Sequence, residues 1–145
     1  MTVLTLEVNH EDKVLNAHIR AIDESDTLSE YYELLDCGQI DMVTISADGH
    51  SYDVVCDDEG LFRQPLVPTL YVSEERVLFG DLAFVKIDDE GKSIGLEKED
   101  ITRLLRYIGQ QQEKLKHWTE KLKRKQEATT ITIEQEAGNG NPKLR

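Results

Sequence analysis

The sequence has few cysteines and prolines and no long apolar run. No stretch approaches the roughly 18 consecutive apolar residues of a membrane-spanning helix, and the N-terminus shows neither the basic nor the apolar segment of a secretory signal. Cys37 and Cys56 stand apart, and neither belongs to a C-x-x-C pair. Because the sequence shows no secretory signal, we expect a protein of the cytoplasm. Since disulfides are rare in that compartment, we expect both thiols to be free.

Signatures of catalysis and metal binding are also missing. The sequence contains no G-x-S-x-G nucleophile turn, no phosphate-binding loop and no dinucleotide fingerprint. Its histidines lack the spacing of a zinc site on a helix; they are His10, His18, His50 and His117. We therefore expect no catalytic residue, no metal, no cofactor and no enzymatic activity.

Negative charge, by contrast, is abundant, and it is unevenly distributed. The chain has 29 acidic and 17 basic residues and a net charge of −12. Residues 1–100 carry 24 acidic and 7 basic side chains, whereas residues 101–145 carry 5 and 10. An acidic body should repel nucleic acid and attract basic surfaces. The basic arm should do the reverse, or fold onto its own body or a neighbouring one.

Apolar periodicity predicts strands in the first half of the chain. Thr2–Val8 alternates in polarity, and a second strand is expected over 14–22, which gives an N-terminal hairpin. Ile40–Ser46 and Tyr52–Cys56 predict another hairpin, because they flank the turn-forming pair Asp48-Gly49. A proline-containing loop should follow over 61–70, with a short edge segment at 70–72.

Between the two hairpins the sequence predicts a short helix. Thr27 and Glu30 have the T-x-x-E spacing of a capping box, in which Thr27 would accept an N–H of the first turn. Cys37-Gly38 should end the helix, with Gly38 as the left-handed residue.

The stretch 77–100 reads as strand, acidic turn, strand and helix start. Val77–Phe79 leads into Gly80-Asp81, and a second apolar run ends at Ile87. From Glu97 the apolar period changes to that of a helix. We predict an α+β fold, with an antiparallel or mixed sheet of five to six strands, one short helix and a long C-terminal helix.

The long helix carries apolar residues at alternating spacings of three and four. This pattern is equally typical of a coiled-coil seam with one polar position and of a helix that packs on its own domain. A strand-like segment, Thr129–Ile133, follows. We divide the chain into an acidic domain at 1–108, a basic helical extension at 109–127 and a flexible tail at 128–145. The seam comprises Ile101, Leu104, Ile108, Gln111, Leu115, Trp118 and Leu122.

Several motifs resemble a known family. They are the IDMVTI segment, the motif Asp57-Asp58-Glu59-Gly60-Leu61, and Phe79-Gly80-Asp81 with the apolar run behind it. Over Leu28–Ile108 the chain resembles domain-of-unknown-function family 3846, with the N-terminal hairpin outside the resemblance. The resemblance implies a habitat in phages, plasmids and conjugative elements of Firmicutes and gut bacteria, and it implies no chemistry.

Two DDEG turns and Asp81 are candidates for an acidic partner-binding surface. Carboxylates in turns can bind hard cations, but neither turn continues as a calcium loop. Asp and Gly are also what a tight turn requires, so a structural role is the simpler interpretation of both turns. The candidate surface comprises Asp57, Asp58, Glu59, Asp81, Asp88, Asp89 and Glu90.

A basic run with one tryptophan is the second candidate site. Such a run can bind phosphate backbones and stack on bases, or lie on an anionic membrane. It can equally be a solvated helix end or a contact with an acidic body, including that of a second copy. The run comprises Lys114, Lys116, Trp118, Lys121, Lys123, Arg124 and Lys125.

Two functional hypotheses follow. The first is a non-catalytic binding or adaptor protein of a phage or mobile element, whose acidic body binds a host or element-encoded protein. An anti-defence inhibitor that imitates nucleic acid is one version, and a homodimer through the C-terminal helix is compatible with it. The alternative is a nucleic-acid-binding accessory protein that uses the basic helix. Neither hypothesis requires a membrane.

Overall fold

The computed structural model describes residues 1–62 and 66–138, with side chains as far as residue 125. Its main element is an antiparallel six-stranded sheet in the order β2-β1-β7-β4-β3, with β8 paired to β7. The predicted α+β class is therefore confirmed. The strands are β1 (Thr2–Val8), β2 (Leu15–Ala21), β3 (Ile40–Ala47), β4 (His50–Asp57), β7 (Leu82–Ile87) and β8 (Ser93–Ile94).

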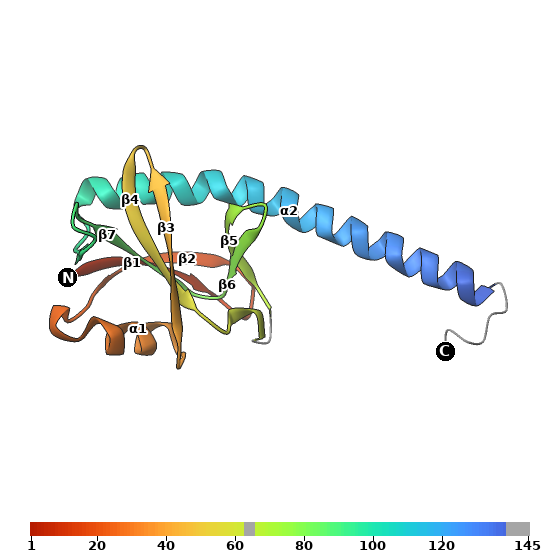
Figure 1. The fold of residues 1–145 in the computed structure, drawn as a ribbon, viewed down its shortest axis with the longest axis horizontal. Helices are drawn as coiled ribbons and strands as arrows, with labels where there is room; N and C mark the ends of the chain where they lie inside the picture. Colours follow the sequence, from red (N-terminus) through yellow and green to blue (C-terminus); the bar gives the residue numbers. More distant parts are fainter. Residues whose placement is uncertain (63–65, 139–145) are drawn as a thin grey trace.

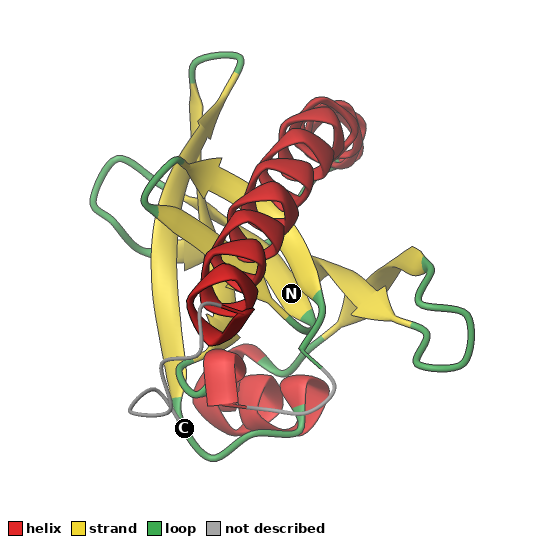
Figure 2. Ribbon diagram, turned by 90° about the vertical axis from the view of Figure 1, so that its right-hand side faces the viewer, coloured by secondary structure: helices red, strands yellow, loops and turns green. Residues whose placement is uncertain are grey.

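Each face of the sheet is covered by one helix (Figures 1 and 2). α1 (Thr27–Leu35) packs on one face with Tyr31 and Leu35, and α2 (Lys98–Gly138) crosses the other. Successive strand residues point to opposite faces. In the central strand β7, Phe84 therefore joins the core under α2 and Val85 the core over α1. None of the helices in the described ranges is long and apolar enough to cross a membrane.

Both predicted hairpins are confirmed. β1 pairs with β2 from Thr2↔Ala21 to Val8↔Leu15, and β3 pairs with β4 from Ile40↔Asp57 to Ala47↔His50. Asp48 and Gly49 have φ of 48° and 79°, the two positive values that a tight hairpin turn uses.

The caps of α1 differ from the prediction by one or two residues. The side chain of Asp26, rather than that of Thr27, accepts the N–H of the first turn, at 3.4 Å from Ser29 N. At the other end Asp36, rather than Gly38, adopts the left-handed conformation, with φ 47°. Aspartate serves well at both positions because its short side chain caps a helix start and tolerates positive φ.

The stretch 77–87 forms two strands that belong to different sheets. β6 (Arg76–Phe79) pairs with β5 (Pro68–Ser73) in a separate two-stranded sheet, while β7 enters the main one. The chain turns between the two sheets at Gly80, where φ is 76°, a conformation that glycine adopts without strain. A short 3₁₀ helix, η2 (Gly60–Phe62), precedes β5.

α2 packs on its own domain through the predicted seam. Leu104, Ile108 and Leu115 are buried, and the buried Gln111 donates from Nε2 to the carbonyl oxygen of Tyr71 at 2.7 Å. The polar seam position thus satisfies the backbone of β5. The helix runs without a break to Gly138, about 60 Å in all, and projects beyond the body (Figure 1).

Residues 129–133 are helical, so the strand-like interpretation of that segment was wrong. The helix also continues through the proposed boundaries at 108 and 127.

The start of α2 is fixed by a buried carboxylate. Asp100 accepts the N–H of Glu97 at 2.8 Å and the hydroxyl of Tyr52 at 2.7 Å. Arg103 and Lys86 lie 3.1 and 3.4 Å from its oxygens. Burial by itself would raise the pKa of Asp100, but the bonds from Glu97 and Tyr52 and the charge of Lys86 outweigh it and hold that pKa below its usual value.

Candidate functional site: an apolar groove with an acidic rim

A groove of about 740 Å³ lies where α2 passes the β5–β6 hairpin and the end of β4. Trp118, Thr119 and Leu122 of α2 form one side, and residues of β6 form the other. Gly60 and Leu61 of η2, together with Leu66 and Pro68, also line the groove. Three parts of the chain that are distant in sequence therefore build this groove.

The lining of the groove is mainly apolar and partly open to solvent. Trp118 packs edge-on against Phe79, with ring centroids 6.4 Å apart. Leu61, Leu66 and Leu122 are 61, 45 and 42% exposed. Exposed apolar side chains that gather in a concave site indicate binding to another molecule.

The rim of the groove is acidic. Five carboxylates and one guanidinium belong to its described lining. The guanidinium of Arg76 is paired with Asp41 at 2.6 Å, and this hydrogen bond lowers the pKa of Asp41. With five carboxylates and one guanidinium, the described lining has an excess of negative charge, and the groove favours a ligand with positive charge. The acidic residues are Asp41, Asp57, Asp58, Glu74 and Glu75.

The cysteine in the lining of the groove is poorly suited to act as a nucleophile. Cys56 lies in its lining but is only 3% exposed, and burial raises the pKa of its thiol to about 11, so the thiolate that would react is scarce at neutral pH. Neither Cys37 nor Cys56 forms a disulfide, as predicted. In the ranges that the structure describes, no three His, Cys, Asp or Glu side chains lie close enough to hold a metal ion.

The seven predicted acidic residues do not form one surface. β4 and β7 are antiparallel, with Cys56 opposite Leu82 and Tyr52 opposite Lys86. The turn after β4 and the turn after β7 therefore lie at opposite ends of the sheet. Of the seven, only Asp57 and Asp58 line the groove.

Three of these aspartates stabilise local structure. Asp57 and Asp88 each accept the N–H two residues ahead, from Glu59 and Glu90, at 2.9 Å. Asp81 accepts the N–H of Val8 at 2.8 Å and so ties β1 to the start of β7. Burial raises the pKa of Asp81 above its usual value. These bonds support the structural interpretation of the DDEG turns.

The basic run is exposed along α2, whereas its tryptophan is partly buried. Trp118 contacts Phe79 edge-on in the groove. Its six basic neighbours all lie on the exposed surface; they are Lys114, Lys116, Lys121, Lys123, Arg124 and Lys125.

Sequence reasoning missed part of the groove. Leu61 was predicted only as part of the family motif and of a loop, and Leu66 only as part of that loop. Glu74 and Glu75 were not among the predicted site residues. The available signal was the adjacent pair Leu61-Phe62, which places two large apolar side chains between a turn and a proline-containing loop. Both are exposed in the structure.

The fold and the groove define an α+β domain with a helix on each face of an antiparallel sheet and an apolar groove beside it. The chain belongs to the family described as Domain of unknown function (DUF3846), whose model matches residues 1–109. This confirms the resemblance and extends it, because the N-terminal hairpin lies inside the match. No curated protein and no solved structure matches the chain. Trp118 and Leu122, which form the α2 side of the groove, lie beyond the match.

Proposed function

We propose that this protein is a non-catalytic binding protein of a phage or mobile element, acting in the bacterial cytoplasm. Its groove would take a basic, amphipathic helix of a protein encoded by the host or the element. The observation that carries the proposal is the combination of half-exposed Leu61, Leu66 and Leu122 with a rim on which five carboxylates outnumber one guanidinium.

The two parts of the groove contribute differently to binding. Covering an exposed leucine with an apolar side chain contributes up to about 1.5–3 kcal/mol. Asp58, Glu74 and Glu75 of the rim are exposed, so they contribute mainly to the rate of association and to the choice of a basic partner. An amphipathic helix with apolar anchors and flanking lysines or arginines provides both kinds of contact.

The proposal is tested with a synthetic amphipathic helix of leucine and lysine, about 18 residues long so that it can form a stable helix. Trp118 is the single tryptophan, so its fluorescence reports occupation of the groove. We expect saturable binding that Leu122→Ser weakens about tenfold. A peptide with glutamate in place of lysine should not bind. Equal binding of both peptides would contradict the proposal.

An anti-defence role is compatible with this groove if the basic helix belongs to a restriction or CRISPR-type effector. Imitation of nucleic acid is supported less well, since that would need a continuous acidic array and the seven predicted carboxylates are divided between two ends of the sheet. The discriminating experiment is a low-salt pull-down with such effectors. A true mimic would be displaced by DNA, and a groove ligand would be displaced by the leucine–lysine peptide.

Nucleic-acid binding through the basic helix remains the second candidate, supported by the exposure of its six basic side chains. Lys121→Glu with Lys123→Glu and Arg124→Glu should then abolish a salt-sensitive shift of single-stranded DNA. If the triple variant binds as well as the parent, this candidate fails. Light scattering on the same proteins tests the homodimer, to which the projecting helix and Leu122 would contribute.

A further inference from the structure

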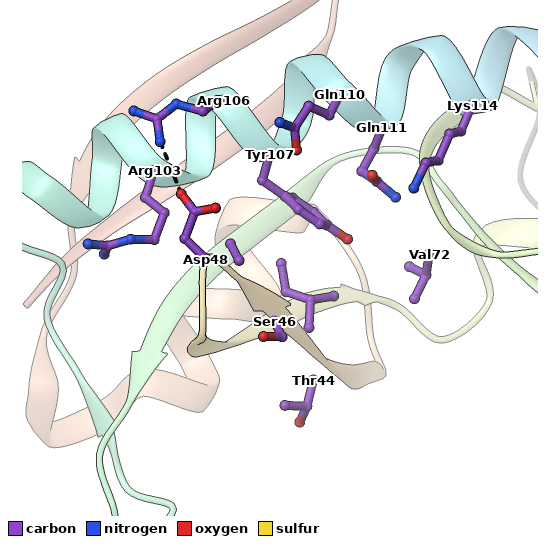
Figure 3. A pocket seen from close by; sticks show the side chains of 12 residues that line it. Thr44, Ser46, Asp48, Val72, Arg103, Arg106, Tyr107, Gln110, Gln111 and Lys114 are labelled. Carbon is purple, nitrogen blue, oxygen red and sulfur yellow. Dashed lines mark hydrogen bonds and ion pairs between the residues drawn. The ribbon is translucent and has the colours of Figure 1, made fainter.

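A second pocket, separate from the groove, lies between α2 and the free edge of the sheet (Figure 3). Its volume is about 450 Å³. Thr44–Ala47 of β3 and Asp48 of the following turn line one part of the pocket, and Val72 of β5 lines another. Side chains of α2 from Arg103 to Lys114 cover both, and we call this space the edge slot.

The edge slot carries mainly positive charge, whereas the body is acidic. Arg103, Arg106 and Lys114 line it, against the single carboxylate of Asp48. Residues 1–100, in contrast, carry more than three acidic side chains for every basic one. Figure 3 shows Arg106 above Asp48 at one side of the slot and Lys114 above Val72 at the other. Arg106 and Lys114 are eight positions apart in the sequence, which corresponds to about 12 Å along the helix.

The cations differ in how firmly they are held. Arg103 donates to Tyr52 and to the buried Asp100, at 2.7 and 3.1 Å, which fixes it in place. Arg106 pairs with Asp48 at 3.0 Å, but the two side chains are 59 and 60% exposed. Such an exposed pair is worth little. A carboxylate of a bound ligand can therefore replace Asp48 as the partner of Arg106 at a small cost in free energy. Lys114 is exposed as well.

The wall opposite the helix is a strand edge. β3 is the last strand of the sheet and, in the described part of the chain, pairs with β4 alone. The outward N–H and C=O groups of an edge strand form a template for another extended chain. The first half of β3 is partly covered, since Asp41 is paired with Arg76 of β6. The part that remains open is the one that faces the edge slot.

We propose that the edge slot binds an extended, acidic peptide segment. The segment adds to β3 as a further strand, and its carboxylates meet Arg106 and Lys114. Backbone pairing explains why an edge strand lines the slot, and the cations explain which sequence is preferred. A lone anion would pair with the cations, but it would leave the outward backbone groups of β3 without a hydrogen-bond partner.

The test uses a blocked peptide of alternating glutamate and valine, titrated into the full chain by calorimetry. Arg106→Gln with Lys114→Gln should weaken binding about tenfold or more. Lys13→Gln with Lys92→Gln removes the same charge at exposed positions outside both the slot and the basic run, and should leave the affinity unchanged. In the NMR spectrum the amide signals of Thr44, Ile45 and Ser46 should move on binding.

A backbone N-methylated version of the peptide separates strand addition from simple anion binding. It keeps the carboxylates but lacks the amide donors, so its binding should be lost. Undiminished binding of the N-methylated peptide would overturn the proposal. So would the absence of saturable binding, or displacement of the peptide by an equal concentration of inorganic phosphate. The groove is a different site, so none of these results bears on the proposed function.

Discussion

Gln111 of α2 donates a hydrogen bond of 2.7 Å to the backbone carbonyl of Tyr71 in β5. Gln112 does the same to the carbonyl of Thr69 at 3.0 Å. Two successive glutamines thus attach the β5–β6 hairpin to the long helix. Because that hairpin forms one side of the groove, these bonds set the shape of the candidate site.

Replacing Gln111 with leucine should destabilise the domain by about 1–2 kcal/mol, because the carbonyl of Tyr71 loses its donor while leucine gains only local apolar contact. Chemical denaturation measures the change, and Gln110→Leu, at an exposed neighbouring position, is the control. A more stable Gln111→Leu protein would instead mean that this position prefers an apolar partner, as a coiled-coil seam does.

Asp100→Asn should cost about 3 kcal/mol, because Lys86 and Arg103 would lose the buried carboxylate that they flank. Glu99→Gln, next to it in the first turn and exposed, should be nearly neutral.

The same pair of proteins has a defined pH dependence. The folded-state pKa of Asp100 lies below its usual value, since the bonds from Glu97 and Tyr52 and the charge of Lys86 outweigh the opposing effect of burial. Its contribution to stability is therefore present above the unfolded-state pKa and is lost as the pH falls through the folded-state pKa. The stability difference between the parent and Asp100→Asn should shrink on acidification. A constant difference would rule out the charge of Asp100 as its source.

Two buried tyrosines should respond oppositely to removal of the hydroxyl. The hydroxyl of Tyr31 has no hydrogen-bond partner in the described structure, and burial raises its pKa to about 12. Tyr31→Phe should therefore be neutral or stabilising by up to about 1 kcal/mol. Tyr52→Phe breaks the bond to Asp100 and should destabilise by about 1.5–3 kcal/mol. Thermal unfolding should show a lower melting temperature for Tyr52→Phe and an unchanged or higher melting temperature for Tyr31→Phe.

Truncation after Gly109 should damage the domain rather than merely remove an arm. It deletes Gln111, the buried Leu115 and Trp118, all of which contact the body. We expect a lower melting temperature and a loosened β5–β6 hairpin, detected by faster amide hydrogen exchange in 68–79. Truncation after Lys125 should leave both unchanged, since it keeps Gln111, Leu115 and Trp118. Equal stability of the two truncated proteins would contradict this view of the helix.

The parts of the fold that depend on local order were predictable from the sequence. The alternation in Thr2–Val8 and the Asp48-Gly49 turn determine their hairpins within a few residues. The cap of α1 was misplaced by one residue because Asp26 and Thr27 are both good capping residues, and the backbone geometry decides between them.

The groove was not predictable in the same way. Gln111 looked like a break in an apolar seam, and its partner Tyr71 is 40 residues away. Leu61 and Leu122 come together only because η2 and α2 meet beside the hairpin. The two DDEG turns were predicted to belong to one acidic surface. Whether two turns lie at the same end of the sheet depends on strand order, which local sequence patterns do not determine.

The most direct test of the account compares two double variants that remove the same charge from opposite ends of the sheet. Asp58→Asn with Glu75→Gln acts at the groove rim, and Asp89→Asn with Glu90→Gln acts at the far turn; all four side chains are exposed. Binding of the leucine–lysine helix is followed through Trp118 at low and high salt. We predict that the rim pair slows association and weakens binding, about three- to tenfold at low salt, and that the far pair changes neither. Equal losses for both pairs would show that only the overall charge matters, and the groove would no longer be the binding site.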